Sequence, residues 1–82
     1  MNAPFVDYLA RCIHYHRKKS GLTQAQLAQF AGIGKTVVFD VEHNKNSVQL
    51  DTLLRILSVL NIDIQLDSPL MKEFQEKYNE TN

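Results

Sequence analysis

Apolar side chains recur every three or four residues over much of the chain, which is the spacing of one face of an α-helix. The first such stretch starts near Pro4, because proline suits the first position of a helix, and it stops at Ser20 and Gly21. In the second stretch, either Phe30 or Ala31 completes the apolar face. The helices that follow the first are predicted over residues 24–31, 35–43, 50–60 and 69–78. The pattern therefore predicts a mainly α-helical protein.

One segment near the C-terminus breaks the helical spacing. Residues 62–67 alternate apolar and polar side chains, which is the period of a half-buried β-strand. The chain offers no second strand, and a strand by itself leaves its backbone groups unpaired. Pairing with the same strand of a second copy would satisfy those groups and produce a two-fold symmetric homodimer. The expected dimerisation residues are Ile62, Ile64 and Leu66.

The second and third predicted helices are joined by a short glycine-containing turn. Thr23 and Gln26 have the spacing of a capping box at the start of the second helix, and Gly32 permits the positive φ of a sharp turn. Ile33 would fill the gap between the two helices, and Val38 would anchor the third. The exposed N-terminal part of the third helix is then free to enter the major groove of DNA.

These residues resemble the lambda-repressor-like (Xre-type) helix-turn-helix family, over roughly residues 9 to 60. The matching positions are Gly21-Leu22-Thr23-Gln24, Leu27-Ala28, Ala31-Gly32-Ile33, Glu42, and the apolar series Leu53, Leu54, Ile56, Leu57 and Leu60. The resemblance implies a domain of four to five helices that binds DNA. The segment that follows is similar to the HipB-like antitoxins, which append a single strand that pairs across a dimer.

We therefore expect a single domain over residues 1–82. The parts of this domain are a helix-turn-helix core over about 4–60, a dimerisation strand over about 62–67 and a C-terminal amphipathic helix over about 69–78.

The resemblance, together with the place of each residue on its helix, indicates which residues contact DNA. The expected base contacts are Lys35, Thr36, Phe39 and Asp40. The expected phosphate contacts are Thr23, Gln24, His43 and Lys45. Family members pair an arginine late in the first helix with a glutamate that ends the third, and here these residues are Arg17 and Glu42. We expect this ion pair to be structural.

Chemistry supports some of these base contacts more than others. A lysine donates to guanine O6 or N7, and a threonine methyl meets the methyl group of thymine. Asp40 is repelled by phosphates unless it accepts a hydrogen bond from cytosine N4. Phe39 is large and apolar for a position that faces the groove, so it packs either on a sugar edge or methyl group, or back onto its own domain.

The charge distribution is compatible with a nucleic-acid partner although the net charge is zero. Up to residue 45, six basic residues stand against three acidic ones, and from residue 46 three basic residues stand against six. The two halves therefore carry +3 and −3, so the first half can meet phosphates. Lys18 and Lys19 lie in that half, either as a solvated face or within the field of the DNA.

Other chemistry is expected to be absent. Cys12 is the single cysteine, so no intrachain disulfide forms and a reducing cytoplasm is the expected location. Neither a signal peptide nor an apolar run of about 20 residues is present, so no membrane partner is expected. Cys12 and His16 are too few ligands for a closed metal site and fit core packing better. We expect neither a cofactor, nor a metal, nor enzymatic activity.

Three functions are compatible with this sequence. The first is a repressor that binds a palindromic operator as a homodimer and acts as a HipB-like antitoxin, with a HipA-like toxin kinase as partner. The second is a stand-alone regulator of the phage or restriction-control type. The third is a protein–protein adaptor that has lost DNA binding, which the zero net charge, Phe39 and Asp40 favour. The C-terminal aromatic residues Phe74 and Tyr78 serve either in packing or as a docking surface for the toxin.

Overall fold

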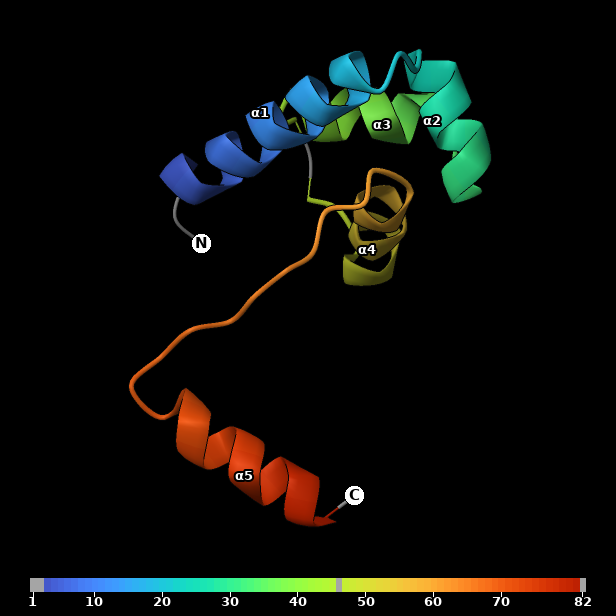
Figure 1. The fold of residues 1–82 in the computed structure, drawn as a ribbon. Coiled ribbons are helices and arrows are strands. Elements are labelled where there is room, and N and C mark those ends of the chain that lie inside the picture. The colour runs from blue at the N-terminus through green and yellow to red at the C-terminus, as the bar shows by residue number, and fades with distance from the viewer. Residues whose placement is uncertain (1–2, 46, 82) are drawn as a thin grey trace.

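The computed structural model describes residues 3–45 and 47–81. Within these residues the chain forms five α-helices and no β-strand. In chain order the helices are α1 (Ala3–Lys19), α2 (Gln24–Ala31), α3 (Lys35–Glu42), α4 (Leu50–Val59) and α5 (Met71–Thr81), as Figure 1 shows. The prediction of a mainly α-helical protein is confirmed.

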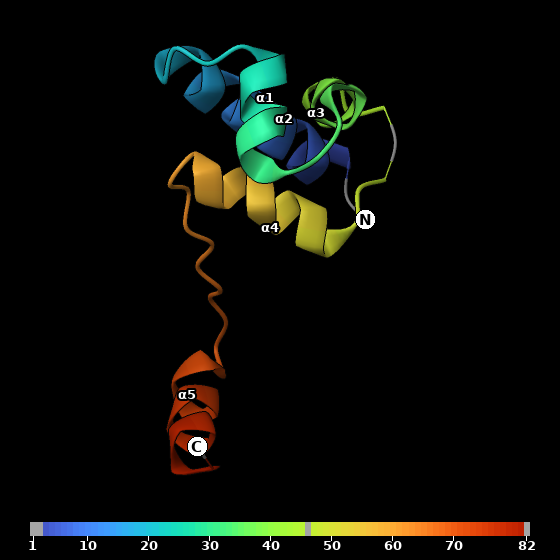
Figure 2. The ribbon, with the colours of Figure 1, turned by 90° about the vertical axis from the view of Figure 1, so that its right-hand side faces the viewer.

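The first four helices pack around one apolar core (Figures 1 and 2). Helix α2 packs against both α3 and α4, and α1 packs against α3. The largest fully buried side chains are Ile13, Leu27, Val38 and Ile56, one from each of these helices. Burying an aliphatic side chain of this size stabilises a fold by about 1.5–3 kcal/mol. The core therefore fixes α3 relative to α2 and α1.

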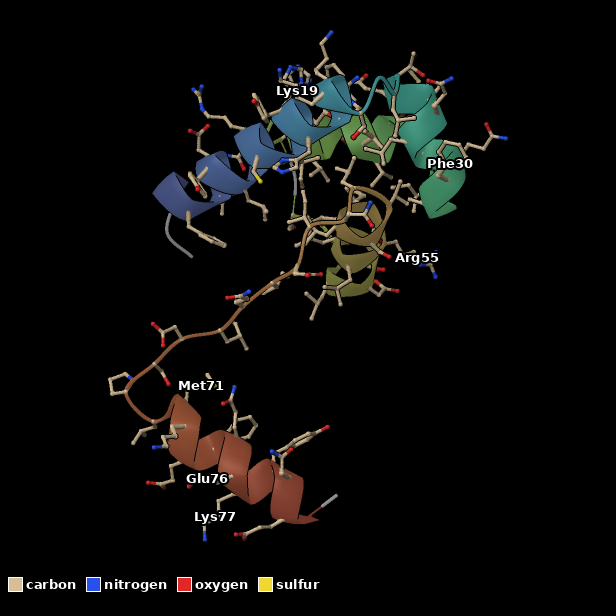
Figure 3. All side chains as sticks on the ribbon, in the orientation of Figure 1. Lys19, Phe30, Arg55, Met71, Glu76 and Lys77 are labelled. Atoms are coloured by element: carbon tan, nitrogen blue, oxygen red, sulfur yellow. The ribbon has the colours of Figure 1, made fainter. Side chains whose placement is uncertain are left out.

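The turn between α2 and α3 forms as its sequence predicts. Thr23 caps α2 with a complete capping box: its hydroxyl accepts from the Gln26 N–H at 3.0 Å, and the Gln26 side-chain oxygen accepts from the Thr23 N–H at 2.9 Å. Gly32 ends α2 with φ of 70°, the left-handed conformation that glycine adopts at low cost. Ala31 is buried and completes the apolar face of α2, whereas Phe30 is 66% exposed and points outward (Figure 3).

The described residues of the single chain form no β-strand over residues 62–67, so the strand predicted to pair across a dimer is not supported by this structure. This segment leaves the four-helix body as an extended connection, and the described residues supply no strand that pairs with it (Figures 1 and 2). The physical reason is that a strand exists only where its N–H and C=O groups meet a partner. Ile64 and Leu66, two of the expected dimerisation residues, are 53% and 73% exposed, while Ile62 packs against the edge of the core.

The last helix starts later than predicted. Pro69 and Leu70 lie in a turn that the Met71 N–H closes by donating to the Ser68 carbonyl at 3.1 Å, so α5 begins at Met71 rather than at Pro69. Helix α5 stands apart from the other four helices in both views (Figures 1 and 2). Two of its apolar side chains, Phe74 and Tyr78, are exposed, and so is Leu70 in the turn just before it. No helix in the described part of the chain is long and apolar enough to span a bilayer.

Candidate nucleic-acid interface

The four residues predicted to contact bases lie on α3, but they do not share one face of the helix. Successive residues of a helix are rotated by about 100°, so Thr36 and Asp40 lie nearly opposite the buried Val38, whereas Phe39 lies about 100° from it and Lys35 about 60°. Lys35 and Thr36, in the first turn, are exposed, whereas Phe39 and Asp40 are half-buried. The first turn therefore presents one ammonium and one hydroxyl group to solvent, which are the groups that can reach base edges.

Phe39 folds back onto the end of its own helix. Its ring stacks on the His43 ring with the centroids 3.9 Å apart, and the Lys45 ammonium lies 4.9 Å from the Phe39 centroid. The His43 Nδ1–H donates to the Phe39 carbonyl at 2.8 Å, which holds the His43 ring at the end of the helix. The structure thus brings one predicted base contact together with two predicted phosphate contacts.

Asp40 lies toward the connection between α3 and α4. It borders a hollow that Ser47, Gln49 and Thr52 also line. Its backbone carbonyl accepts from the Lys45 N–H at 3.0 Å, which ties the start of that connection to α3. The base contact assigned to Asp40 stays a prediction.

Arg17 and Glu42 form an ion pair between α1 and α3. The Arg17 Nε and Nη2 atoms donate to the two Glu42 carboxylate oxygens at 2.6 and 3.1 Å, and Arg17 Nη1 donates to the Leu22 carbonyl at 2.8 Å. The exposed fractions of the two side chains are 9% and 0%. Because these three hydrogen bonds reach from α1 to the turn before α2 and to α3, they fix these elements relative to α1.

Two further side chains donate to the same carboxylate. The His14 Nδ1 atom lies 2.9 Å from Glu42 Oε1, and the Gln24 side-chain nitrogen donates to this oxygen at 3.2 Å. We call these four residues, His14, Arg17, Gln24 and Glu42, the Glu42 cluster. Burial raises the pKa of the Glu42 carboxyl, but the hydrogen bonds from Arg17, His14 and Gln24 and the charge of Arg17 outweigh it, so the pKa lies below its ordinary value.

The sequence prediction missed His14 as a member of this cluster. The signal was its spacing of three residues from Arg17, which puts both side chains on the same flank of α1. The cluster also holds the side chain of Gln24, a predicted phosphate contact, at the start of α2. One N–H of its amide donates to Glu42, and the second remains for another acceptor.

A shallow basic hollow lies at the N-terminus of α2, and we call it the α2 hollow. Its lining includes three cationic side chains, those of Arg17, Lys18 and Lys35. It also includes Thr23 and Gln24 at the start of α2. The N-terminus of a helix carries a partial positive charge and free N–H groups, which favour anions. Anionic oxygen atoms such as those of a phosphate fit this place.

Cys12 and His16 lie one turn apart on α1, with their side chains in contact. The described residues contain no group of three or more potential metal ligands. His16 Nδ1 lies 2.7 Å from the Cys12 carbonyl oxygen and 3.5 Å from the Cys12 sulfur. Because that ring nitrogen donates to the backbone of its own helix, the geometry agrees with packing.

Three known proteins have sequences similar to that of this chain. The chain is 33% identical over 66 residues to the immunity repressor protein of Bacillus phage phi105, which covers 77% of this chain and 46% of the repressor. It is 31% identical over 58 residues to the control protein C.SmaI of Serratia marcescens, covering 71% of this chain and 69% of that protein. It is 34% identical over 53 residues to y4mF, an uncharacterised HTH-type transcriptional regulator of Sinorhizobium fredii, covering 65% and 70%. The chain spans about half the length of the phage repressor.

A solved structure has a similar fold. The chain aligns with a HipB variant in a complex with an O2 20-mer at a TM-score of 0.70 and 30% identity, covering 78% of this chain and 89% of that chain. The sequence pattern of the helix-turn-helix family matches residues 13–66, which include α2, its glycine turn, α3 and α4. The chain therefore belongs to the helix-turn-helix family of the Xre, or lambda-repressor-like, type.

Proposed function

We propose that this protein is a transcriptional repressor that binds a specific DNA operator through α3. The observation that carries the proposal is the exposed first turn of α3, with Lys35 and Thr36, placed beside the α2 hollow. In this family arrangement the third helix enters the major groove while the start of the second helix meets the backbone. Lys35 and Thr36 read bases, joined in our proposal by Phe39 and Asp40.

Phosphate contacts position the protein on the duplex in this proposal. Thr23 and Gln24 lie at the N-terminus of α2, and His43 and Lys45 lie at the other end of α3. These two groups therefore flank the reading surface on either side. Contacts of this kind set register without carrying sequence information, whereas the first turn of α3 supplies the specificity.

We propose that the protein acts as a homodimer on a palindromic operator. The extended segment 62–67 carries the exposed apolar side chains of Ile64 and Leu66 and pairs with no strand in the described part of the chain, so a second copy of the same segment can pair with it. A two-fold dimer places two copies of α3 on half-sites about one helical turn apart. Sedimentation of the wild type and of an Ile64→Lys/Leu66→Lys variant tests this: the wild type is expected to be dimeric and the variant monomeric and folded. A wild-type monomer at micromolar concentration would contradict the homodimer.

The similarity to HipB supports a finer proposal, that the protein is an antitoxin that represses its own operon and binds a HipA-like toxin kinase. Co-expression with a kinase encoded beside it is expected to give a complex that survives purification. The absence of such a gene or complex would leave a stand-alone regulator. The phage immunity repressor and the control protein favour that second function, because each name describes a regulator and mentions no toxin.

The DNA-binding proposal is tested by titrating the purified protein against the DNA upstream of its own gene. The variant is Lys35→Ala/Thr36→Ala, and the control is Lys72→Ala, which removes one positive charge from α5, far from α3. Each lost base contact costs about 1–3 kcal/mol, so the double variant is expected to bind at least about tenfold more weakly. The control is expected to bind as the wild type does. A folded wild type that binds no DNA at low salt would instead support the adaptor function.

A further inference from the structure

We propose that the phosphate-binding surface continues from α2 across α1, and that Lys18 is its central contact. The inference rests on the proposed function, because its ligand is the phosphodiester backbone of the bound DNA. It adds α1 to the DNA-binding surface, whereas the contacts expected from the family resemblance lie at the start of α2, on α3 and just after α3. The observation that carries it is that two separate hollows on this side of the molecule share Lys18.

The second hollow lies between α1 and the end of α3, and we call it the α1–α3 hollow. Its α1 wall includes Arg11, His14 and Lys18, and its other wall includes His43 and Asn44, which follow the last residue of α3. The α2 hollow lies on the other side of Lys18, with Lys35 and the N-terminus of α2 in its lining. The proposed phosphate contacts at the start of α2 and at the end of α3 are therefore linked by one continuous surface that passes over Lys18.

The charges in the α1–α3 hollow leave Lys18 available. Two acidic side chains, Asp7 and Glu42, also line the hollow. Asp7 accepts from Arg11 Nε at 2.9 Å, and Glu42 is neutralised by Arg17. In the described part of the chain Lys18 has no acidic partner, and its side chain is exposed. The Lys18 ammonium therefore lies between the two hollows. A DNA backbone that joins the two sets of proposed phosphate contacts would pass over this position.

Two histidines that line the α1–α3 hollow use one ring nitrogen each within the protein. His14 Nδ1 bonds Glu42, and His43 Nδ1 bonds the Phe39 carbonyl. The neutral rings therefore supply no further N–H to an anion, and the cation at this place is Lys18. The flexible stem of a lysine lets its ammonium act as an adjustable point charge on a phosphate, so Lys18 needs no rigid geometry to contribute.

Lys19 gives a closely matched control. It follows Lys18 in the same helix, is also exposed and carries the same charge, but it lines neither hollow. Its ammonium lies 5.8 Å from the Tyr15 ring centroid, and it projects outward from the end of α1 (Figure 3). Lys18→Ala and Lys19→Ala therefore remove the same charge from adjacent positions, and only the first touches the proposed surface.

The experiment measures DNA affinity of the full-length protein between 50 and 200 mM salt, for the wild type, Lys18→Ala, Lys19→Ala and Lys18→Arg. Each phosphate neutralised contributes about 0.9 to the slope of log affinity against log salt, so loss of Lys18 from both subunits of a dimer is expected to lower the slope by about 1.8. Raising the salt over this range would then weaken DNA binding by the wild type about tenfold more than DNA binding by Lys18→Ala. Lys19→Ala and Lys18→Arg are expected to keep the wild-type slope.

The outcomes separate this inference from the proposed function. If the wild type binds DNA and Lys18→Ala has the same slope as Lys19→Ala, the α1 contact is refuted while the repressor proposal stands. If the folded wild type binds no DNA, the proposed function fails and this inference fails with it. Equal weakening of Lys18→Ala on operator and on unrelated duplex supports a phosphate contact, whereas weakening on the operator alone would contradict it.

Discussion

Replacing Glu42 by glutamine tests the role that the structure gives to the Glu42 cluster. The substitution keeps the shape of the side chain and removes its charge. Arg17 would then stay buried, 9% exposed, without the carboxylate that accepts from its Nε and Nη2 atoms. The three elements that meet at Glu42, namely α1, α2 and α3, would lose their shared acceptor.

The expected magnitude follows from this burial. Removing one partner of a buried ion pair costs about 3–5 kcal/mol, because the other charge is left uncompensated. Glutamine keeps one carbonyl oxygen as an acceptor, so we expect the lower end, about 3 kcal/mol. A domain of this size has a free energy of unfolding of only about 4–12 kcal/mol and loses about 4–8 °C in Tm per kcal/mol. Glu42→Gln should therefore lower Tm by about 12–24 °C.

The assay is urea and thermal unfolding followed by circular dichroism at pH 7. The matched control is Asp7→Asn, which breaks the ion pair with Arg11 on the same helix. Those two side chains are 54% and 80% exposed, and exposed pairs contribute at most about 1 kcal/mol. If the two variants lost the same stability, the Glu42 cluster would be no more important than a surface ion pair and the reasoning would be refuted.

The remaining predictions concern pH, the turn, the cap and the last helix. Because the pKa of Glu42 in the folded protein lies below its unfolded value, its stabilisation is present above the unfolded pKa and is lost as pH falls through the folded pKa. Urea titrations of wild type and Glu42→Gln should therefore converge as the pH is lowered through this acidic range. Gly32→Ala, at φ of 70°, should cost about 1–2 kcal/mol in the same titration, whereas Gly34→Ser, at φ of −79°, should not destabilise; equal losses would contradict a conformational cause. Thr23→Ala should cost about 1 kcal/mol and Thr23→Ser much less, since serine keeps the cap; an equal loss in both would argue against the capping box. A chain that ends at Asp67 should unfold within about 1 kcal/mol of the full chain because no α5 residue belongs to the core cluster, and a loss of several kcal/mol would mean that α5 packs on the body in solution.

Local signals predicted the helix-turn-helix part of the fold because they act over only a few residues. Thr23 and Gln26 make their capping bonds across one helical turn, and Gly32 sets the backbone angle by itself. The 3.6-residue spacing of apolar side chains gave the positions of the helices to within a few residues. The C-terminus was predicted less well, because whether residues 62–67 form a strand depends on a partner that this chain alone does not contain.

The sequence by itself determined that this chain forms short helices, where the sharp turn lies, and that Lys35 and Thr36 begin the third helix. Only the tertiary structure decided which distant side chains meet. It placed His14 and Gln24 on the Glu42 carboxylate, turned Phe39 onto His43 and Lys45, and put Lys18 in the lining of two hollows. The physical reason is that helix spacing fixes the face on which a residue lies, whereas its partners depend on how the buried core rotates and tilts one helix against another.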